Sequence, residues 1–130
     1  HNQSYWRGID YLGLGAGAHS YAHAPDWGRR WSNERIPERY IAAVERGDAA
    51  VGRETLSFET AAAEFMFLGL RERDGIDPAA FARRFGRALE DVHPEVAVFR
   101  ADGFLEERAG RVALSERGLL LADSIFAAFV

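Results

Sequence analysis

The sequence predicts an α+β protein in which an incomplete sheet at the N-terminal end precedes a small helical domain of winged-helix-like arrangement. Three observations lead to this prediction. Residues 1–14 hold two short stretches of strand type, separated by a turn. Apolar segments of helical period then follow, each bounded by glycine, proline or a capping residue. A hairpin signal with a turn glycine, Ala109-Gly110, precedes the last of them.

The N-terminal stretch is interpreted as two short strands. Residues 1–6, HNQSYW, alternate as a strand does between two polar-aromatic faces. The RGID sequence that follows predicts a turn, and residues 11–14 suit a second, buried strand. The segment from there to residue 33 has no apolar period and is expected to be irregular. Because two strands with exposed edges are not independently stable, we expect residues 1–35 to leave apolar surface exposed.

A glycine-rich segment, YLGLGAGAHS at residues 11–20, is the one site-like signal in the chain. Gly13, Gly15 and Gly17 lie two apart behind an apolar run, where a missing Cβ permits close approach or a positive φ. A dinucleotide fingerprint needs the spacing G-x-G-x-x-G and an amphipathic helix after it. Here the spacing is G-x-G-x-G, and Pro25 and Gly28 interrupt any following helix. The pattern therefore argues against a dinucleotide site.

Residues 36–57 are expected to hold a helix and a linker. Pro37 suits the first turn of a helix, and apolar residues up to Val44 fall on one face before Gly47 ends it. Ser57 is a plausible cap for the next helix, from residue 58 to about residue 73. That helix is apolar around most of its circumference, so we expect it to be covered on both sides and to form the hub of the chain.

Three more helical segments and a hairpin complete the predicted domain. Asp77 followed by Pro78 is the start signal of a helix that Gly86 ends. A helix over residues 89–101 follows, opened or kinked by Pro94, and His93 beside that proline is expected at the surface.

The hairpin is predicted from strands over residues 104–107 and 111–114. Ser115 and Glu116 then start the last helix, whose apolar residues recur at helical spacing up to Phe129.

Charge and composition exclude several classes of function. A winged helix raises the possibility of DNA binding, but from Arg53 onward ten arginines face fourteen acidic residues. Counterion release requires the opposite sign, so we expect no nucleic-acid partner. No apolar run is long enough for a transmembrane span, and cysteine is absent. We therefore expect a cytoplasmic protein in which these residues supply no disulfide and no thiolate-bound metal. Since the chain begins with His1 and carries no signal peptide, we interpret it as part of a longer protein.

Four stretches together resemble a known family: HNQSYW, YLGLGAGAHS, ETLSFETAAAEFMFLGLRERDGID and GFLEERAGRVALSERGLLLADSIF. In this order, and across nearly the whole chain, they resemble the C-terminal part of the oxygen-independent coproporphyrinogen III oxidase-like radical-SAM proteins. The similarity looks closest to the branch regarded as haem chaperones.

The resemblance implies the fold of a C-terminal fragment. Residues 1–35 would be the terminal strands and glycine loop of a partial (β/α) barrel, residues 36–57 a helix and linker, and residues 58–130 a helical, winged-helix-like C-terminal domain. In this family the barrel holds a [4Fe–4S] cluster through three cysteines and uses it to cleave S-adenosylmethionine. These cysteines are absent from the present chain, so the fragment alone would not be an enzyme.

The resemblance also implies site residues. The H-N-x-x-Y-W pattern implicated in haem binding is matched by His1, Asn2, Tyr5 and Trp6, with His1 as the axial ligand of the haem iron. The alternative is a strand that only closes the barrel wall.

The glycine loop would lie at the ligand-facing rim near S-adenosylmethionine, and it would offer Gly13, Gly15, Ala16, His19 and Ser20. The alternative is a tight turn without ligand contact. A metal pair of His19 and His23 is disfavoured because glycine and proline flank it.

Three functions follow from the resemblance. The first is haem binding and delivery to a haem-acceptor protein, and the second is decarboxylation of coproporphyrinogen III. The third is a purely structural C-terminal lid. The exposed apolar surface expected on residues 1–35 also makes self-association of the fragment plausible.

Overall fold

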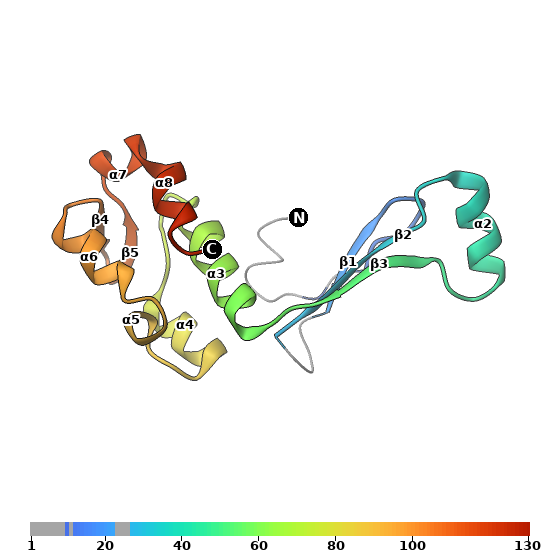
Figure 1. The fold of residues 1–130 in the computed structure, drawn as a ribbon, viewed down its shortest axis with the longest axis horizontal. Helices are drawn as coiled ribbons and strands as arrows, with labels where there is room; N and C mark the ends of the chain where they lie inside the picture. The colour runs from blue at the N-terminus through green and yellow to red at the C-terminus, as the bar shows by residue number, and fades with distance from the viewer. Residues whose placement is uncertain (1–9, 11, 23–26) are drawn as a thin grey trace. The chain divides into compact units, whose positions relative to one another are not determined.

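The computed structural model describes residues 10, 12–22 and 27–130, which fall into two compact units, His1–Ser57 and Phe58–Val130 (Figure 1). The strand expected over residues 1–6 lies outside the described residues. Both units combine strands with helices, which confirms the α+β class. In the part of the chain that the structure describes, no helix is both long and apolar enough to cross a membrane.

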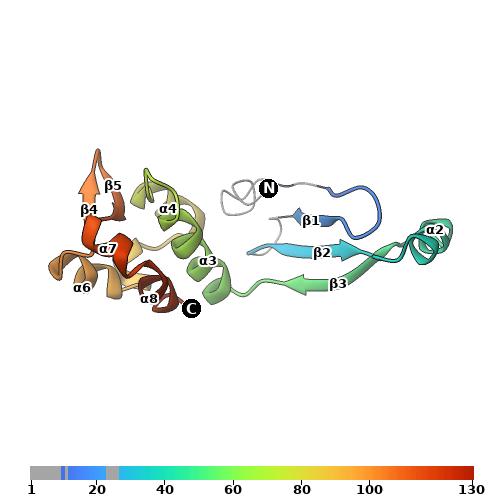
Figure 2. The ribbon, with the colours of Figure 1, turned by 90° about the horizontal axis from the view of Figure 1, so that it is seen from above.

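The first unit is a three-stranded antiparallel sheet with one helix, as Figure 2 shows. Its strands lie side by side in the order β1 (His19–Ala22), β2 (Arg29–Asn33) and β3 (Ala50–Thr55), and α2 (Pro37–Glu45) connects β2 to β3. Ser20 is opposite Trp31 across β1 and β2, and Arg30 is opposite Glu54 across β2 and β3. The register shifts between Arg30 and Ser32, where β2 contains an irregularity.

The sequence-based prediction for this unit was wrong in two respects. Residues 12–14 belong to no strand, and Leu12 and Leu14 are 70% and 84% exposed, so the apolar run is not a buried strand. The segment expected to be irregular contains β1 and β2, and the expected linker contains β3. These strands are short and polar, and pairing between distant segments stabilises them more than any local preference does.

The helix of the first unit was predicted correctly. Pro37 lies in the first turn of α2, and Gly47 follows the helix with a φ of +91°, a conformation that costs glycine little. Within the described residues, only part of the apolar face of α2 is buried. Ala43 is buried, whereas Ile41 and Val44 are 58% and 51% exposed.

The second unit is helical with a two-stranded hairpin. Its elements, in chain order, are α3 (Phe58–Leu70), α4 (Pro78–Phe85), α5 (Leu89–Val92), α6 (Glu95–Ala101), β4 (Leu105–Arg108), β5 (Arg111–Leu114), α7 (Glu116–Leu120) and α8 (Ala122–Ala127). The helix expected over residues 89–101 is broken at His93, and Pro94 opens its second part, α6. The last helix is broken at Leu121, whose backbone leaves the helical region.

Local capping groups fix the ends of these helices. The Asp77 side chain accepts a hydrogen bond from the Ala79 N–H (3.0 Å), and Gly86 ends α4 in the left-handed conformation. The Ser115 hydroxyl accepts from the Gly118 N–H (3.0 Å) at the start of α7 and donates to the Gly103 carbonyl (2.5 Å). Ser115 therefore joins the end of the hairpin to the loop that precedes it.

Helix α3 lies against α4, α8 and β5 and supplies much of the core of the second unit. Its buried side chains occupy more than one face, as expected of a helix that is apolar around most of its circumference. Phe65 meets Phe81 and Phe85 edge to face, with ring centroids 5.4 and 5.8 Å apart. Phenylalanine packing thus ties α3 to α4.

His93 is a core residue, and the expectation that it lies at the surface was wrong. It is only 7% exposed, and its ring meets those of Phe81 and Phe129 at centroid distances of 5.9 and 5.3 Å. Burial lowers the pKa of His93, against the smaller opposing effects of a hydrogen bond with the backbone of Ala62 and of the Glu95 charge. The break between α5 and α6 turns this side chain inward.

Candidate functional site

The glycine loop precedes β1 in the first unit and is held in one conformation by the chain itself. Gly15 and Gly17 have φ values of +101° and +72°, which a residue with a side chain adopts only under strain. The Gly17 N–H donates to the Glu34 carbonyl (2.9 Å), and the Ala18 N–H donates to the Gly15 carbonyl (3.3 Å). The segment is therefore a tight turn whose glycines are required by its backbone.

Gly13 serves a different purpose, namely close packing. A Cβ at this position would overlap the carbonyl oxygen of His19 and lie 2.8 Å from the Cβ of Ala18. The Gly13 N–H donates to the hydroxyl of Ser20 (2.9 Å), which is 1% exposed. The loop thus folds back onto β1, where the buried hydroxyl of Ser20 accepts its hydrogen bond.

Two residues from later elements hold the loop from the other side. The side-chain amide of Asn33, at the end of β2, donates to the carbonyls of Gly13 (3.2 Å) and Gly15 (3.0 Å). The hydroxyl of Tyr40, on α2, accepts from the Gly15 N–H (3.2 Å). Sequence reasoning missed both residues, because they lie 18 or more positions away and no local motif marks them.

Several residues of the loop and of the start of β1 are exposed. Leu14, Ala16 and His19 are exposed, and within the described residues the structure records no hydrogen-bond partner for the backbone N–H of Leu14 or Ala16. His19 and Ser20 are neighbours on β1, so their side chains point to opposite faces of the sheet. Of the predicted loop residues, Gly13, Gly15 and Ser20 form hydrogen bonds within the protein, whereas Ala16 and His19 are exposed.

The remaining predicted residues are not placed. His1, Asn2, Tyr5 and Trp6, which the resemblance associates with haem, lie outside the described residues, and so does His23. Among the residues that are described, no group of three or more His, Cys, Asp or Glu side chains is arranged to hold a metal ion.

A second polar feature lies on β2 and β3. A depression of about 410 Å³ is lined by Arg29, Arg30, Trp31, Ala50, Arg53, Glu54 and Thr55. Arg30 binds Glu54 through two hydrogen bonds, 2.6 and 3.1 Å long, and this contact lowers the pKa of Glu54.

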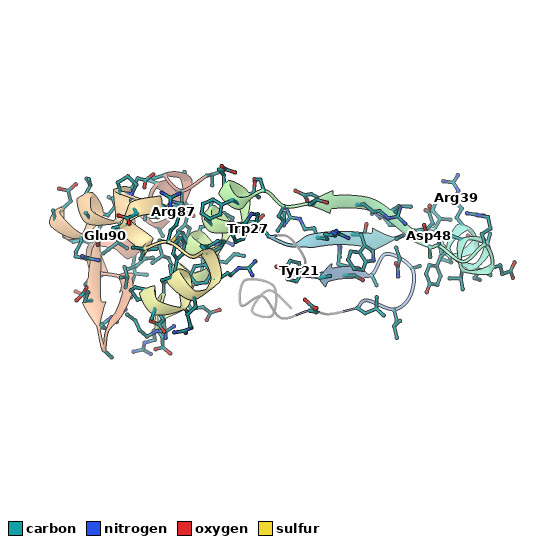
Figure 3. The ribbon with its side chains drawn as sticks, turned by 90° about the horizontal axis from the view of Figure 1, so that it is seen from below. Tyr21, Trp27, Arg39, Asp48, Arg87 and Glu90 are labelled. Atoms are coloured by element: carbon teal, nitrogen blue, oxygen red, sulfur yellow. The ribbon has the colours of Figure 1, made fainter. Side chains whose placement is uncertain are left out.

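Asp48 lies in the turn between α2 and β3 (Figure 3). The Ala50 N–H donates to the Asp48 carboxylate (3.0 Å), as does Arg53 (2.5 Å). The backbone hydrogen bond and then the arginine lower the pKa of Asp48. A carboxylate whose pKa is lowered is ionised near neutral pH and offers no proton for acid catalysis.

The glycine loop is held in shape by hydrogen bonds with Ser20, Asn33 and Tyr40, and it carries the exposed side chains of Leu14 and Ala16. A loop of defined shape with exposed side chains is an arrangement that can contact a ligand.

The chain is similar to several known proteins. The family described as the HemN C-terminal domain matches residues 56–121, which is half of the chain. Among curated proteins, the heme chaperone HemW of Bacillus subtilis is 34% identical over 132 residues, covering 100% of this chain and 34% of the relative. The heme chaperone HemW of Mycobacterium tuberculosis is 34% identical over 126 residues, covering 96% of this chain and 30% of the relative. The chain thus spans about a third of the length of these relatives.

A solved structure is also similar. It is a radical SAM enzyme, the coproporphyrinogen III oxidase HemN of Escherichia coli, and it superposes with a TM-score of 0.64 at 19% identity. The match covers 93% of this chain and 28% of that one. At this identity the likeness shows the fold. With the family match over half of its length, the chain belongs to the HemN C-terminal domain family.

Proposed function

We propose that this chain is the C-terminal region of a radical-SAM, coproporphyrinogen-oxidase-like protein that binds haem and delivers it to an acceptor protein. The observation that carries the proposal is the extent of the similarity. Relatives named heme chaperones match 96–100% of the chain, including the first unit, which the family match largely leaves out. The likeness to the oxidase HemN supports the fold and no particular activity, so decarboxylation of coproporphyrinogen is not favoured.

The finer architecture is part of the proposal. Residues 1–35 would complete a partial (β/α) barrel, and residues 58–130 would form a winged-helix-like domain. The segment between them holds α2 and β3, and β3 pairs with β2. The hairpin β4–β5 between α6 and α7 supports the winged-helix-like domain. The antiparallel pairing of β1 with β2 means that this part of the chain would add a small meander to the end of a barrel of parallel strands.

The cluster proposed for the parent protein does not fit the residues of this chain. A [4Fe–4S] cluster needs thiolate ligands, and these 130 residues contain no cysteine. The cluster and most of the S-adenosylmethionine site would therefore belong to the remaining two thirds of a full-length relative. This chain would contribute the glycine loop to that site, with Ala16 and His19 facing the ligand and Gly13, Gly15 and Ser20 holding the loop's shape.

Haem is the proposed cargo, and His1 is the proposed ligand of its iron. Asn2, Tyr5 and Trp6 would support the bound macrocycle. A neutral imidazole is a common axial ligand, and aromatic rings pack well on a porphyrin. The exposed histidine of the glycine loop, His19, provides a matched control, because it is proposed to face S-adenosylmethionine and not the haem iron.

The test is a haem titration of the full-length protein that carries this chain, followed by its Soret absorption. We expect saturable binding near one haem per chain, a shifted and weakened Soret band for His1→Ala, and no change for His19→Ala. Equal spectra for all three proteins would remove His1 as the ligand. Failure of the unmodified protein to bind haem would contradict the proposed function and favour the alternative of a purely structural C-terminal lid.

A further inference from the structure

The three glycines of the loop are held by the protein in the same way. The N–H group of each donates a hydrogen bond to a residue that follows the glycines in the chain. The pairs are Gly13 with the Ser20 hydroxyl (2.9 Å), Gly15 with the Tyr40 hydroxyl (3.2 Å) and Gly17 with the Glu34 carbonyl (2.9 Å). The acceptors belong to β1, to α2 and to the segment between β2 and α2. Every second N–H of the loop is therefore bound by the surrounding chain.

Gly15, at the centre of the loop, is bound through both of its backbone polar groups. Its N–H donates to the Tyr40 hydroxyl, and its carbonyl accepts from the side-chain amide of Asn33 (3.0 Å). Its φ of +101° is one of several conformations that glycine adopts at little cost. The local backbone alone does not select this conformation, so the two side chains select it.

Asn33 makes three of the hydrogen bonds that hold the loop. Its side-chain amide donates to the carbonyls of Gly13 (3.2 Å) and Gly15 (3.0 Å), which uses both of its N–H hydrogens. Its backbone N–H donates to the Ala18 carbonyl (2.8 Å). Asn33 is thus bonded to the loop at residues 13, 15 and 18.

The side-chain bonds of Asn33 and Tyr40 hold the loop and contribute nothing to strand pairing or to the helix. Strand β2 pairs with its neighbours through backbone groups, and Asn33 lies opposite Ala50 in that ladder. Helix α2 begins at Pro37 and is formed by its own backbone. Removal of the Asn33 amide or of the Tyr40 hydroxyl is therefore expected to release the loop and to leave these elements intact.

We propose that Asn33 and Tyr40 are positioning residues that hold the glycine loop, before any ligand arrives, in the conformation that contacts S-adenosylmethionine. This inference rests on the proposed function, in which the loop borders the site of that cofactor. A loop that is already ordered loses less conformational entropy on binding, so it binds more tightly than the same loop left flexible. Neither side chain needs to touch the ligand to have this effect.

The first test follows hydrogen exchange of the loop by mass spectrometry in the full-length protein that carries this chain. Without ligand, Asn33→Ala and Tyr40→Phe are expected to increase deuterium uptake by residues 12–18, because the glycine N–H groups lose protection. Added S-adenosylmethionine is expected to reduce this uptake again. Unchanged uptake in both variants would overturn the proposal, and so would an uptake that S-adenosylmethionine does not reduce.

The second test measures the affinity for S-adenosylmethionine by equilibrium dialysis. We expect roughly tenfold weaker binding for Asn33→Ala, which loses two hydrogen bonds, and roughly threefold weaker binding for Tyr40→Phe, which loses one. Asn33→Asp keeps the shape of the side chain but offers no donor to the two carbonyls, so it is expected to bind no better than Asn33→Ala. Binding of Asn33→Asp at the unmodified affinity would mean that the side chain only fills space, and it would overturn the proposal.

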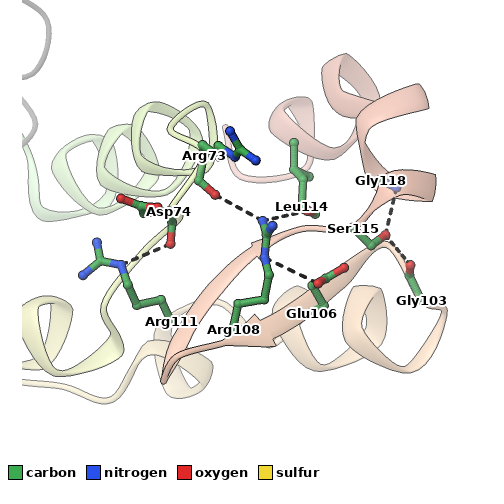
Figure 4. A network of polar contacts seen from close by, with 9 residues as sticks. All are labelled: Arg73, Asp74, Gly103, Glu106, Arg108, Arg111, Leu114, Ser115 and Gly118. Atoms are coloured by element: carbon green, nitrogen blue, oxygen red, sulfur yellow. Dashed lines mark hydrogen bonds and ion pairs between the residues drawn. The ribbon is translucent and has the colours of Figure 1, made fainter.

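Arg108 provides a matched control in the second unit. Like Asn33, its side chain donates to two backbone carbonyls, those of Arg73 (3.1 Å) and Leu114 (3.4 Å), as Figure 4 shows. Arg108→Met removes these bonds and is expected to change neither the exchange of the loop nor the affinity for S-adenosylmethionine. Equal losses of affinity for Arg108→Met and Asn33→Ala would indicate a general loss of stability and would overturn the proposal.

A haem titration separates failure of this inference from failure of the proposed function. Asn33→Ala is expected to keep the Soret band of the unmodified protein, because His1 is the proposed ligand of the iron. If the unmodified protein and the Asn33 and Tyr40 variants bind S-adenosylmethionine equally well, this inference alone is overturned. If the unmodified protein does not bind S-adenosylmethionine, the proposed ligand of the loop is overturned together with it.

Discussion

Individual residues in the glycine loop have distinct roles that glycine spacing alone does not reveal. Gly13 leaves room for the carbonyl of His19, whereas Gly15 provides a positive φ and has no atom within 4 Å of an added Cβ. A side chain at Gly13 therefore meets backbone, which cannot move without shifting β1.

For this reason we expect Gly13→Ala to destabilise the first unit by about 1–3 kcal/mol. Urea unfolding followed by tryptophan emission measures the effect. Gly47→Ala is the control, because its φ of +91° strains an alanine by about 1 kcal/mol and its Cβ would meet nothing within 4 Å. If Gly13→Ala lowers the midpoint no more than Gly47→Ala does, the close approach to His19 is not a constraint.

A buried histidine makes the stability of the second unit depend on pH. Burial lowers the pKa of His93 below 6.5, so at acidic pH the unfolded chain binds a proton that the folded chain refuses. The free energy of unfolding therefore falls as the pH decreases below 6.5, and the contribution is fully present above that value. We expect His93→Leu to remove this loss between about pH 7 and pH 5, as judged by urea unfolding at 222 nm.

Glu64, on α3, has the opposite effect on the pH dependence of stability. Burial raises its pKa from 4.5 to about 7, so the folded state retains a proton that the unfolded state releases. The resulting stability is present below pH 4.5 and is lost as the pH rises through 7. Glu64→Gln should thus stabilise the unit by about 1–2 kcal/mol at pH 8, after allowance for partial exposure. For His93, the contrary result would be a His93→Leu variant whose free energy of unfolding still falls between about pH 7 and pH 5, which would mean that another group titrates.

At the scale of elements, the hairpin β4–β5 contains a strained residue at its turn. Ala109 and Gly110 connect the strands with φ values of +52° and +76°. Both values are positive, as in a type I′ turn, and this turn favours Asn-Gly over Ala-Gly. An alanine there is held in a conformation that it rarely adopts.

We therefore expect Ala109→Asn to stabilise the second unit by about 0.5–1 kcal/mol, which raises the Tm by about 2–8 °C for a domain of this size. Thermal unfolding at 222 nm measures the shift. Ala97→Gly, an exposed site inside α6, should lower the Tm because glycine costs about 1 kcal/mol in a helix. A lower Tm for Ala109→Asn would show that the turn is not of this type.

Elements with local start and stop signals were predicted from the sequence. Asp77, Pro78 and Gly86 bound α4 as expected, and the hairpin strands lie within one residue of their predicted bounds. The first unit was largely missed, because RRWSN and HSYA show no strand pattern alone and become strands by pairing. In the candidate site, the glycines were identified by their spacing of two residues behind an apolar run. Asn33 and Tyr40, which hold them, act from distant elements and leave no local signal.

For the whole molecule, aromatic residues divide between the two units and allow each to be followed separately. The chain has three tryptophans, four tyrosines and nine phenylalanines. Every tryptophan and tyrosine precedes Ser57, and every phenylalanine lies in the second unit. Tryptophan emission therefore reports on the first unit, whereas ellipticity at 222 nm is dominated by the helices of the second.

The two units also differ in how much they bury. Among the described residues before Ser57, the buried side chains are Ser20, Tyr21, Ala43 and Leu56. The second unit buries a far larger set, including Phe81, Met66, Leu70, Ile76 and Val112. A three-stranded sheet with one helix and so small a core is marginally stable, because little apolar area offsets its conformational entropy.

We therefore expect two unfolding transitions in urea, with the tryptophan signal lost at a lower concentration than the ellipticity. Gly13→Ala should lower only the first midpoint, and Ala109→Asn should raise only the second. If the preceding two thirds of a full-length relative cover the exposed Leu12 and Leu14, adding them should raise the first midpoint towards the second. Coincident transitions in the present chain, shifted together by both variants, would instead mean that the units fold as one cooperative body.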